Sequence, residues 1–87
     1  MLRDTDYARE LCEPGVLRLS DGSEARIERL LIKQSDVEEI RFSYWANGNL
    51  ARLPLDLSEE HLLALFEDAI NKDVLSSDFK ARLRALL

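Results

Sequence analysis

The Asn47-Gly48 dipeptide lies between two runs of alternating apolar residues and predicts a β-hairpin. Both central residues of a type I′ turn need positive φ, which Asn and Gly adopt at low cost. A two-residue loop then places three apolar pairs on one face, because side chains alternate with period two. These pairs are Tyr44 with Ala51, Phe42 with Leu53, and Ile40 with Leu55. A slip of one residue would oppose aromatic residues to Arg52 and Pro54, so the pattern fixes the register.

Pro54 indicates where the second strand of this hairpin lies in the sheet. The hairpin strands are expected at residues 38–46 and 49–55. The pair 41:54 is not hydrogen-bonded in this register, so the missing N–H of Pro54 costs nothing toward the first strand. The position of the missing N–H faces away from the first strand of the hairpin. The second strand is therefore expected at the edge of the sheet, or to end near Pro54.

Two further strands are expected before the hairpin, at residues 16–19 and 25–32, with a turn at residues 20–23. An odd-length loop with a bulge places their apolar residues on one face. These residues are Leu17, Leu19, Ala25 and Ile27. A helix over residues 24–33, capped by Ser23, remains open as an alternative. Residues 4–12 have weak helical character and end before a Glu-Pro-Gly turn signal.

Two helices are expected after the strands. Ser58 is the N-cap of the first, and Leu57 and Leu62 have the spacing of a hydrophobic staple. Its apolar stripe contains Leu62, Leu63, Phe66, Ala69 and Ile70. Ser76-Ser77 begins the second helix, whose stripe contains Phe79, Leu83, Leu86 and Leu87.

The order of these elements predicts an α+β fold formed by residues 1–87 as one small domain. The expected architecture is an antiparallel β-meander of three to four strands with two C-terminal helices packed on one face. The covered face is expected to carry Ile40, Phe42, Tyr44, Ala51, Leu53 and Leu55.

Composition excludes several classes of protein. The chain is 46% hydrophobic and 33% charged, which argues against disorder. Its net charge of −5 opposes nonspecific binding to nucleic acid or to an anionic membrane, so nucleic acid is not an expected partner. No apolar run approaches the roughly 18–20 residues of a spanning helix, and a membrane partner is not expected. One cysteine and no apolar N-terminal segment favour a cytoplasmic protein.

No catalytic, cofactor or metal site is expected. His61 stands beside Glu59 and Glu60 without a second histidine or a nearby cysteine to complete a set of metal ligands. Cys12 has no CxxC partner and no basic neighbour that would lower its pKa. We expect a solvated histidine, a structural thiol and a protein that is not an enzyme. An enzyme with a carboxylate-based site is the weakest alternative.

Charge is distributed unevenly over the two helices. Acidic residues gather between positions 56 and 73, whereas Lys80, Arg82 and Arg84 lie near the C-terminus. The simpler interpretation is that these are solvated helix faces and complements of the helix dipole. The alternative is an acidic regulator that binds a basic protein partner through the 56–73 helix.

The outer face of the hairpin is the candidate interaction surface. Arg41, Trp45, Leu50 and Arg52 are expected on this face, with Leu50 opposite Trp45 and Arg52 opposite Ser43. Trp and Arg are enriched at binding hot spots, which favours a homodimer or another protein as partner. Alternatively, the N-terminal segment with Tyr7 and Leu11 covers Trp45. The leading hypothesis is a non-enzymatic protein-interaction module that self-associates.

Overall fold

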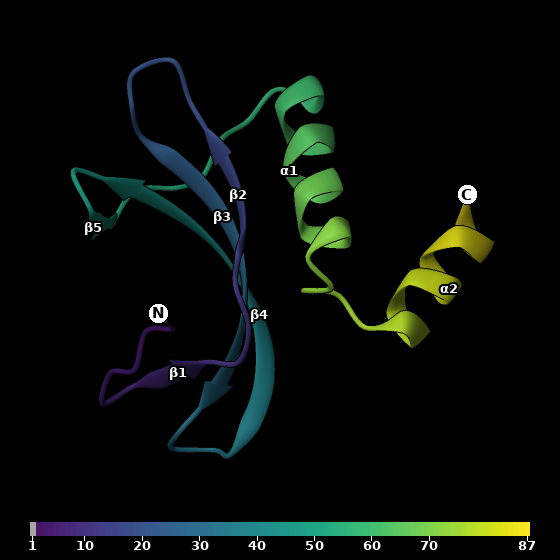
Figure 1. The fold of residues 1–87 in the computed structure, drawn as a ribbon, viewed down its shortest axis with the longest axis horizontal. Helices are drawn as coiled ribbons and strands as arrows, with labels where there is room; N and C mark the ends of the chain where they lie inside the picture. Colours follow the sequence, from purple (N-terminus) through teal and green to yellow (C-terminus); the bar gives the residue numbers. More distant parts are fainter. Residues whose placement is uncertain (1) are drawn as a thin grey trace.

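The computed structural model describes residues 2–87 and confirms the α+β fold: an antiparallel sheet followed by two C-terminal helices (Figure 1). The strands are β1 (Ala8–Glu10), β2 (Gly15–Arg18), β3 (Glu24–Ile32), β4 (Val37–Ala46) and β5 (Asn49–Ala51). The helices are α1 (Glu59–Asn71) and α2 (Ser77–Leu86). The segment 24–33 is therefore a strand, and its helical alternative is wrong.

The central strand β3 pairs with β4 along its whole length and with two short strands on its other side. The sheet order is β1-β3-β4-β5, and β2 also pairs with β3. Ala8 opposes Ile32 in the β1 pairing, and Leu17 opposes Ala25 in the β2 pairing. The shared face of Leu17 and Ala25 confirms the predicted odd-length loop between β2 and β3.

A strand replaces the helix expected over residues 4–12. Ala8 and Glu10 are buried on one face of β1 while Arg9 is exposed, which is the period-two pattern of a strand. The backbone N–H of Leu11 donates to the carbonyl of Arg29 at 3.0 Å, which extends the contact with β3. Pairing with β3 thus overrides the weak local helical preference.

The hairpin at Asn47-Gly48 has the predicted register but a shorter second strand. Asn47 and Gly48 have φ of 54° and 76°, as a type I′ turn requires. Tyr44 opposes Ala51 and Trp45 opposes Leu50. β5 lies at the sheet edge, as Pro54 indicated, and ends at Ala51.

Three pairs expected beyond Ala51 do not form, because the chain leaves the sheet there. These are Phe42 with Leu53, Ile40 with Leu55, and Ser43 with Arg52. Leu55 instead packs with Leu57 against the main core as the chain runs toward α1. Burial of these two leucines accounts for the early end of the strand.

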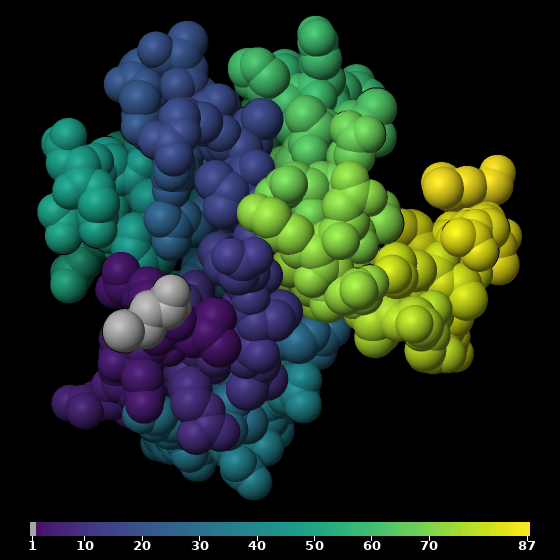
Figure 2. Space-filling model, in the orientation of Figure 1, coloured from purple at the N-terminus to yellow at the C-terminus, as the bar shows by residue number. Residues whose placement is uncertain are grey.

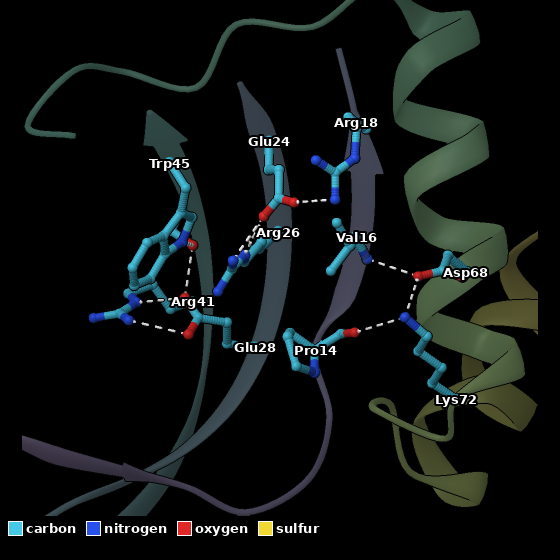
Figure 3. A network of polar contacts seen from close by, with 11 residues as sticks. Pro14, Val16, Arg18, Glu24, Arg26, Glu28, Arg41, Trp45, Asp68 and Lys72 are labelled. Atoms are coloured by element: carbon cyan, nitrogen blue, oxygen red, sulfur yellow. Dashed lines mark hydrogen bonds and ion pairs between the residues drawn. The ribbon is translucent and has the colours of Figure 1, made fainter. Parts of the chain in front are cut away.

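The main core lies between the sheet and α1. Its buried members are Ala25, Ile27, Leu65, Ala69 and Val74. α1 lies alongside β2, and polar contacts join the two elements (Figures 1 and 3). The closest approach is at Gly15. The carboxylate of Asp68 accepts from the backbone N–H of Val16 at 2.7 Å and from Lys72 at 3.0 Å. These donors hold the pKa of Asp68 below its usual value.

The second helix is not packed on the sheet as expected. α2 contains no buried residue and extends away from the end of α1 (Figures 1 and 2). Among residues 2–87, no strand and no other helix packs along it. Only α1 covers the sheet face. The buried connection Val74-Leu75 takes core space near the end of α1 and directs α2 outward.

Candidate interaction surfaces

Trp45 is the centre of a polar cluster on the sheet face opposite α1. Its indole N–H donates to the hydroxyl of Ser43 at 2.8 Å, and that hydroxyl donates to Glu28 at 2.6 Å (Figure 3). The guanidinium of Arg41 binds the same carboxylate in a bidentate manner, at 2.9 and 3.1 Å. We call Glu10, Glu28, Arg41, Ser43 and Trp45 the Trp45 cluster.

Two guanidinium groups cover the indole ring of Trp45. The Cζ atoms of Arg3 and Arg26 lie 4.4 and 4.2 Å from the ring centroid, within the range of a cation–π contact. Glu24 holds Arg26 in place at 2.6 Å. Trp45 is consequently 2% exposed.

The expectation that Trp45 forms part of an accessible surface is therefore wrong. The N-terminal segment covers it, as in the alternative, but through Arg3, while Tyr7 is 59% exposed. Leu50 opposes Trp45 and is exposed, and Arg41 points inward to Glu28. Arg52 is exposed beyond the end of β5. The four candidate residues do not form one surface.

Glu10 brings a second carboxyl group to the Trp45 cluster. Its Oε1 accepts from the backbone N–H of Arg3 at 2.6 Å, and its backbone N–H donates to the carbonyl of Arg3 at 2.9 Å. Its Oε2 is buried without a hydrogen-bond partner. Burial, and then the adjacent carboxyl of Glu28, raise the pKa of Glu10.

The pKa of Glu28 is shifted in the opposite direction to that of Glu10. Burial opposes its charge, but the hydrogen bonds from Arg41 and Ser43 outweigh burial and lower its pKa. The two carboxyl groups influence each other's titration, and Glu10 comes from β1 while Glu28 comes from β3. No sequence pattern pairs these two residues, because their proximity depends on the β1–β3 register.

An exposed apolar surface lies on the other side of the sheet. The ring of Phe42 on β4 meets that of Phe66 on α1 edge to face, with 6.1 Å between centroids. The helix continues this surface with Leu62, Leu63 and Ile70, and Leu63 is 73% exposed. We call Phe42, Leu62, Leu63, Phe66 and Ile70 the apolar surface.

The apolar stripe of α1 is wider than the sheet can cover. Leu65 and Ala69 form the buried centre of the stripe. The apolar surface lies beside them on the same helix. The sequence analysis placed Leu62, Leu63, Phe66 and Ile70 on the apolar stripe of a helix that covers the sheet. The width of the stripe was the signal that part of it stays exposed, because a surface helix needs an apolar arc of only about 100° to cover a core.

Acidic side chains border the apolar surface. Glu59 and Glu60 line a shallow depression with Leu62, Leu63 and Phe66. Glu67 lines the adjoining one, with Leu63, Phe66 and Ile70. The surface is thus an apolar strip with carboxylates along its edge.

α2 has the complementary character. Phe79, Leu86 and Leu87 are exposed and Leu83 is half-buried, which leaves an apolar stripe facing solvent. Lys80, Arg82 and Arg84 flank this stripe, with Asp78 the one acidic residue of the helix.

His61 and Cys12 do not take part in a larger site. His61 is exposed in the first turn of α1, where its backbone N–H donates to the N-cap hydroxyl of Ser58 at 3.1 Å. Cys12 packs against the main core, and burial raises the pKa of its thiol. In residues 2–87, no three His, Cys, Asp or Glu side chains gather as a metal site requires. Neither helix of this stretch is long and apolar enough to cross a membrane.

Comparisons with protein-family models, with curated proteins and with solved structures found no match for this chain. The candidate surfaces are therefore interpreted from their own geometry and chemistry.

Proposed function

We propose that this protein is a non-enzymatic interaction module that self-associates through the apolar surface. The observation that carries the proposal is the edge-to-face pair of Phe42 and Phe66, continued by Leu62, Leu63 and Ile70 on the outside of the fold. Contiguous exposed apolar side chains rimmed by polar residues are typical of protein interfaces. Their burial would contribute favourable free energy in proportion to the apolar area removed from water.

Charge favours a second copy as the partner. The rim of Glu59, Glu60 and Glu67 suits a basic partner, and the basic, apolar helix α2 belongs to the same chain. The acidic rim also argues against nucleic acid as the occupant, because phosphates and carboxylates repel.

The geometry of the acidic groups supports a role other than catalysis. Glu10, whose pKa is raised, is enclosed, and its free oxygen has almost no contact with solvent. A general acid must reach its substrate within hydrogen-bond distance. The proposal includes a cytoplasmic location, which rests on the single cysteine of the sequence.

The second candidate is an acidic regulator that binds a different, basic protein through α1. The carboxylate rim beside the apolar surface favours it, since an amphipathic basic helix from any chain has the required character. Such a protein would remain monomeric alone at all concentrations.

Light scattering from micromolar to millimolar concentration tests the proposal. The wild-type protein is expected to dimerise, and Leu63→Ser to dissociate the dimer, because Leu63 is largely exposed and its loss spares the core. The matched control is Leu50→Ser on the opposite sheet face, which should leave the dimer intact. A wild-type monomer at every concentration would refute self-association. Dissociation by Leu50→Ser alone would refute the apolar surface as its site.

A further inference from the structure

We propose that α2 of each copy docks on the apolar surface of the other, so that two chains exchange their C-terminal helices reciprocally. This inference rests on the proposed self-association and names the element that provides the contact. Figure 2 shows α2 projecting from the body beyond the end of α1, a geometry suited to reaching a second molecule.

Among residues 2–87, no strand and no other helix packs against α2. It has 10 residues, and isolated helices shorter than about 12–15 residues are only marginally stable in water. The Ser76 hydroxyl caps its first turn by accepting from the N–H of Phe79 at 3.1 Å, and one cap is not enough to stabilise a short helix alone. Packing of the apolar stripe against another surface would supply the missing stabilisation.

The connection before α2 is held by the core. Val74 and Leu75 are buried, and the carbonyl of Val74 accepts from the guanidinium of Arg29 at 2.8 Å. The N–H of Val74 donates to Ala69 at 3.0 Å, and Lys80 binds Asp73 at 3.2 Å. These contacts hold the start of α2 in a position from which the helix extends away from its own α1 (Figure 1). Docking on a second copy preserves them.

The two apolar elements match in length and spacing. Phe79, Leu83 and Leu86 recur at i, i+4 and i+7, the anchor pattern of a helix that lies on an apolar surface. Leu62, Phe66 and Ile70 form a row of i+4 spacing on α1, and such rows pack between the side chains of a neighbouring helix.

The charges at the edges of these elements are opposite. Glu67 lies at the C-terminal end of the acidic rim, and Arg84 lies in the last turn of the basic helix. Contact between the two would favour α2 of a second copy over a second α1, because two α1 rims repel each other. Charge therefore favours contact between α1 of one copy and α2 of the other over contact between two α1 helices.

Reciprocal docking closes on itself. If α2 of one chain occupies the partner's apolar surface, a two-fold axis places the second α2 on the first chain in the same way. Both apolar surfaces and both helices are then used. The expected assembly is a dimer that does not grow further.

Disulfide trapping tests the contact directly in the full-length chain. One protein carries Leu63→Cys and another carries Leu83→Cys, both with Cys12→Ala to remove the native thiol. Leu83 lies mid-stripe, so the test does not depend on which way α2 runs. Mixed under mild oxidation, the two proteins should give far more of the cross-linked heterodimer than either gives of a homodimer. A control mixture of Leu50→Cys with Leu83→Cys should not cross-link.

A charge exchange provides the second test. Glu67→Arg and Arg84→Glu should each raise the dimer Kd by about 5-fold, and the double variant should restore it, because the attraction is re-formed with reversed sign. Arg52→Glu is the matched control and should leave the Kd unchanged. Additive loss in the double variant would overturn the proposed pairing.

The results separate this inference from the function it rests on. A wild-type protein that stays monomeric refutes both. A dimer that dissociates with Leu63→Ser but survives Phe79→Ser combined with Leu83→Ser retains self-association and refutes exchange of α2. Circular dichroism and urea unfolding confirm that each variant keeps the fold.

Discussion

Gly15 of β2 lies so close to Ala69 of α1 that a Cβ atom on Gly15 would be 2.7 Å from both the Cα and the Cβ of Ala69. Real Cβ atoms do not approach backbone this closely, so the helix rests directly on the strand. The neighbouring hydrogen bond joins the N–H of Val16, the residue after Gly15, to Asp68, the residue before Ala69. This contact sets how α1 lies on the sheet and which part of its apolar stripe remains outside.

Gly15→Ala is expected to lower the free energy of unfolding by about 1–3 kcal/mol, because the added methyl group forces helix and strand apart. Urea unfolding measures the loss. Gly48→Ala is the control: its site is open, but its positive φ costs about 1 kcal/mol through the backbone alone. A smaller loss at Gly15 than at Gly48 would show that β2 and α1 separate easily.

Trp45→Ala should destabilise the fold by about 3–5 kcal/mol, the usual cost of removing a large buried aromatic side chain. This reverses the expectation for a surface hot spot, where the same change would weaken association and spare stability. Urea unfolding at a single low protein concentration measures the effect. A fully stable Trp45→Ala protein would show that the indole is not buried in solution.

The contact of Arg3 with the Trp45 ring can be tested by fluorescence, because Trp45 is the single tryptophan of the sequence. Arg3→Ala should shift its fluorescence to longer wavelength and increase quenching by acrylamide, because a guanidinium is removed from above the ring. Arg9→Ala, on the exposed side of β1, is the matched control and should leave the spectrum unchanged. Identical spectra for all three proteins would contradict the role of Arg3.

The sequence was sufficient for features with a local physical cause. Positive φ at Asn47-Gly48 set the hairpin register, and the hydroxyls of Ser58 and Ser76 marked the starts of both helices. These signals depend on residues within a few positions of one another. The order of the elements from β2 to α2 then followed from short connections and alternating apolar residues.

Features that depend on distant residues were not predictable in this way. The contact of Arg3 with Trp45 joins segments 42 positions apart, and it depends on β1 pairing with β3 rather than forming a helix. The position of α2 was missed for a similar reason. Its stripe resembles that of a core helix, and only the buried Val74-Leu75 connection turns it away from the sheet.

The ion pair of Arg41 and Glu28 is expected to contribute more than the surface pairs. The Glu28 side chain is fully buried and that of Arg41 is 31% exposed, so Arg41→Met leaves an uncompensated buried charge. The expected loss is about 2–4 kcal/mol in urea unfolding. Arg82→Met is the control, because its 3.8 Å pair with Asp78 is exposed and should contribute almost nothing. Equal effects of the two substitutions would contradict the buried network.

The pair of Glu10 and Glu28 predicts a specific dependence of stability on pH. The pKa of Glu10 is raised in the folded protein by burial and by Glu28, while the hydrogen bond from the Arg3 N–H and the charge of Arg26 act in the opposite direction. The folded state therefore binds more protons than the unfolded chain once the pH exceeds the unfolded glutamate pKa of about 4.3. The contribution of Glu10 to stability is complete below that pH and is lost as the pH rises through the folded pKa. Glu28 acts oppositely: its pKa is lowered, so its contribution is lost as the pH falls.

Glu10→Gln isolates the first of these effects, because the amide imitates the protonated carboxyl and cannot ionise. Its stability relative to wild type should be lowest near pH 4 and should increase toward pH 8, where the wild-type protein must bury a second negative charge beside Glu28. Urea unfolding at several pH values measures this difference. Glu39→Gln, at an exposed position of β4, provides the control and should show a difference that does not change with pH. If the Glu10→Gln difference is equally flat, or declines as the pH rises, Glu10 does not hold a proton in the folded protein.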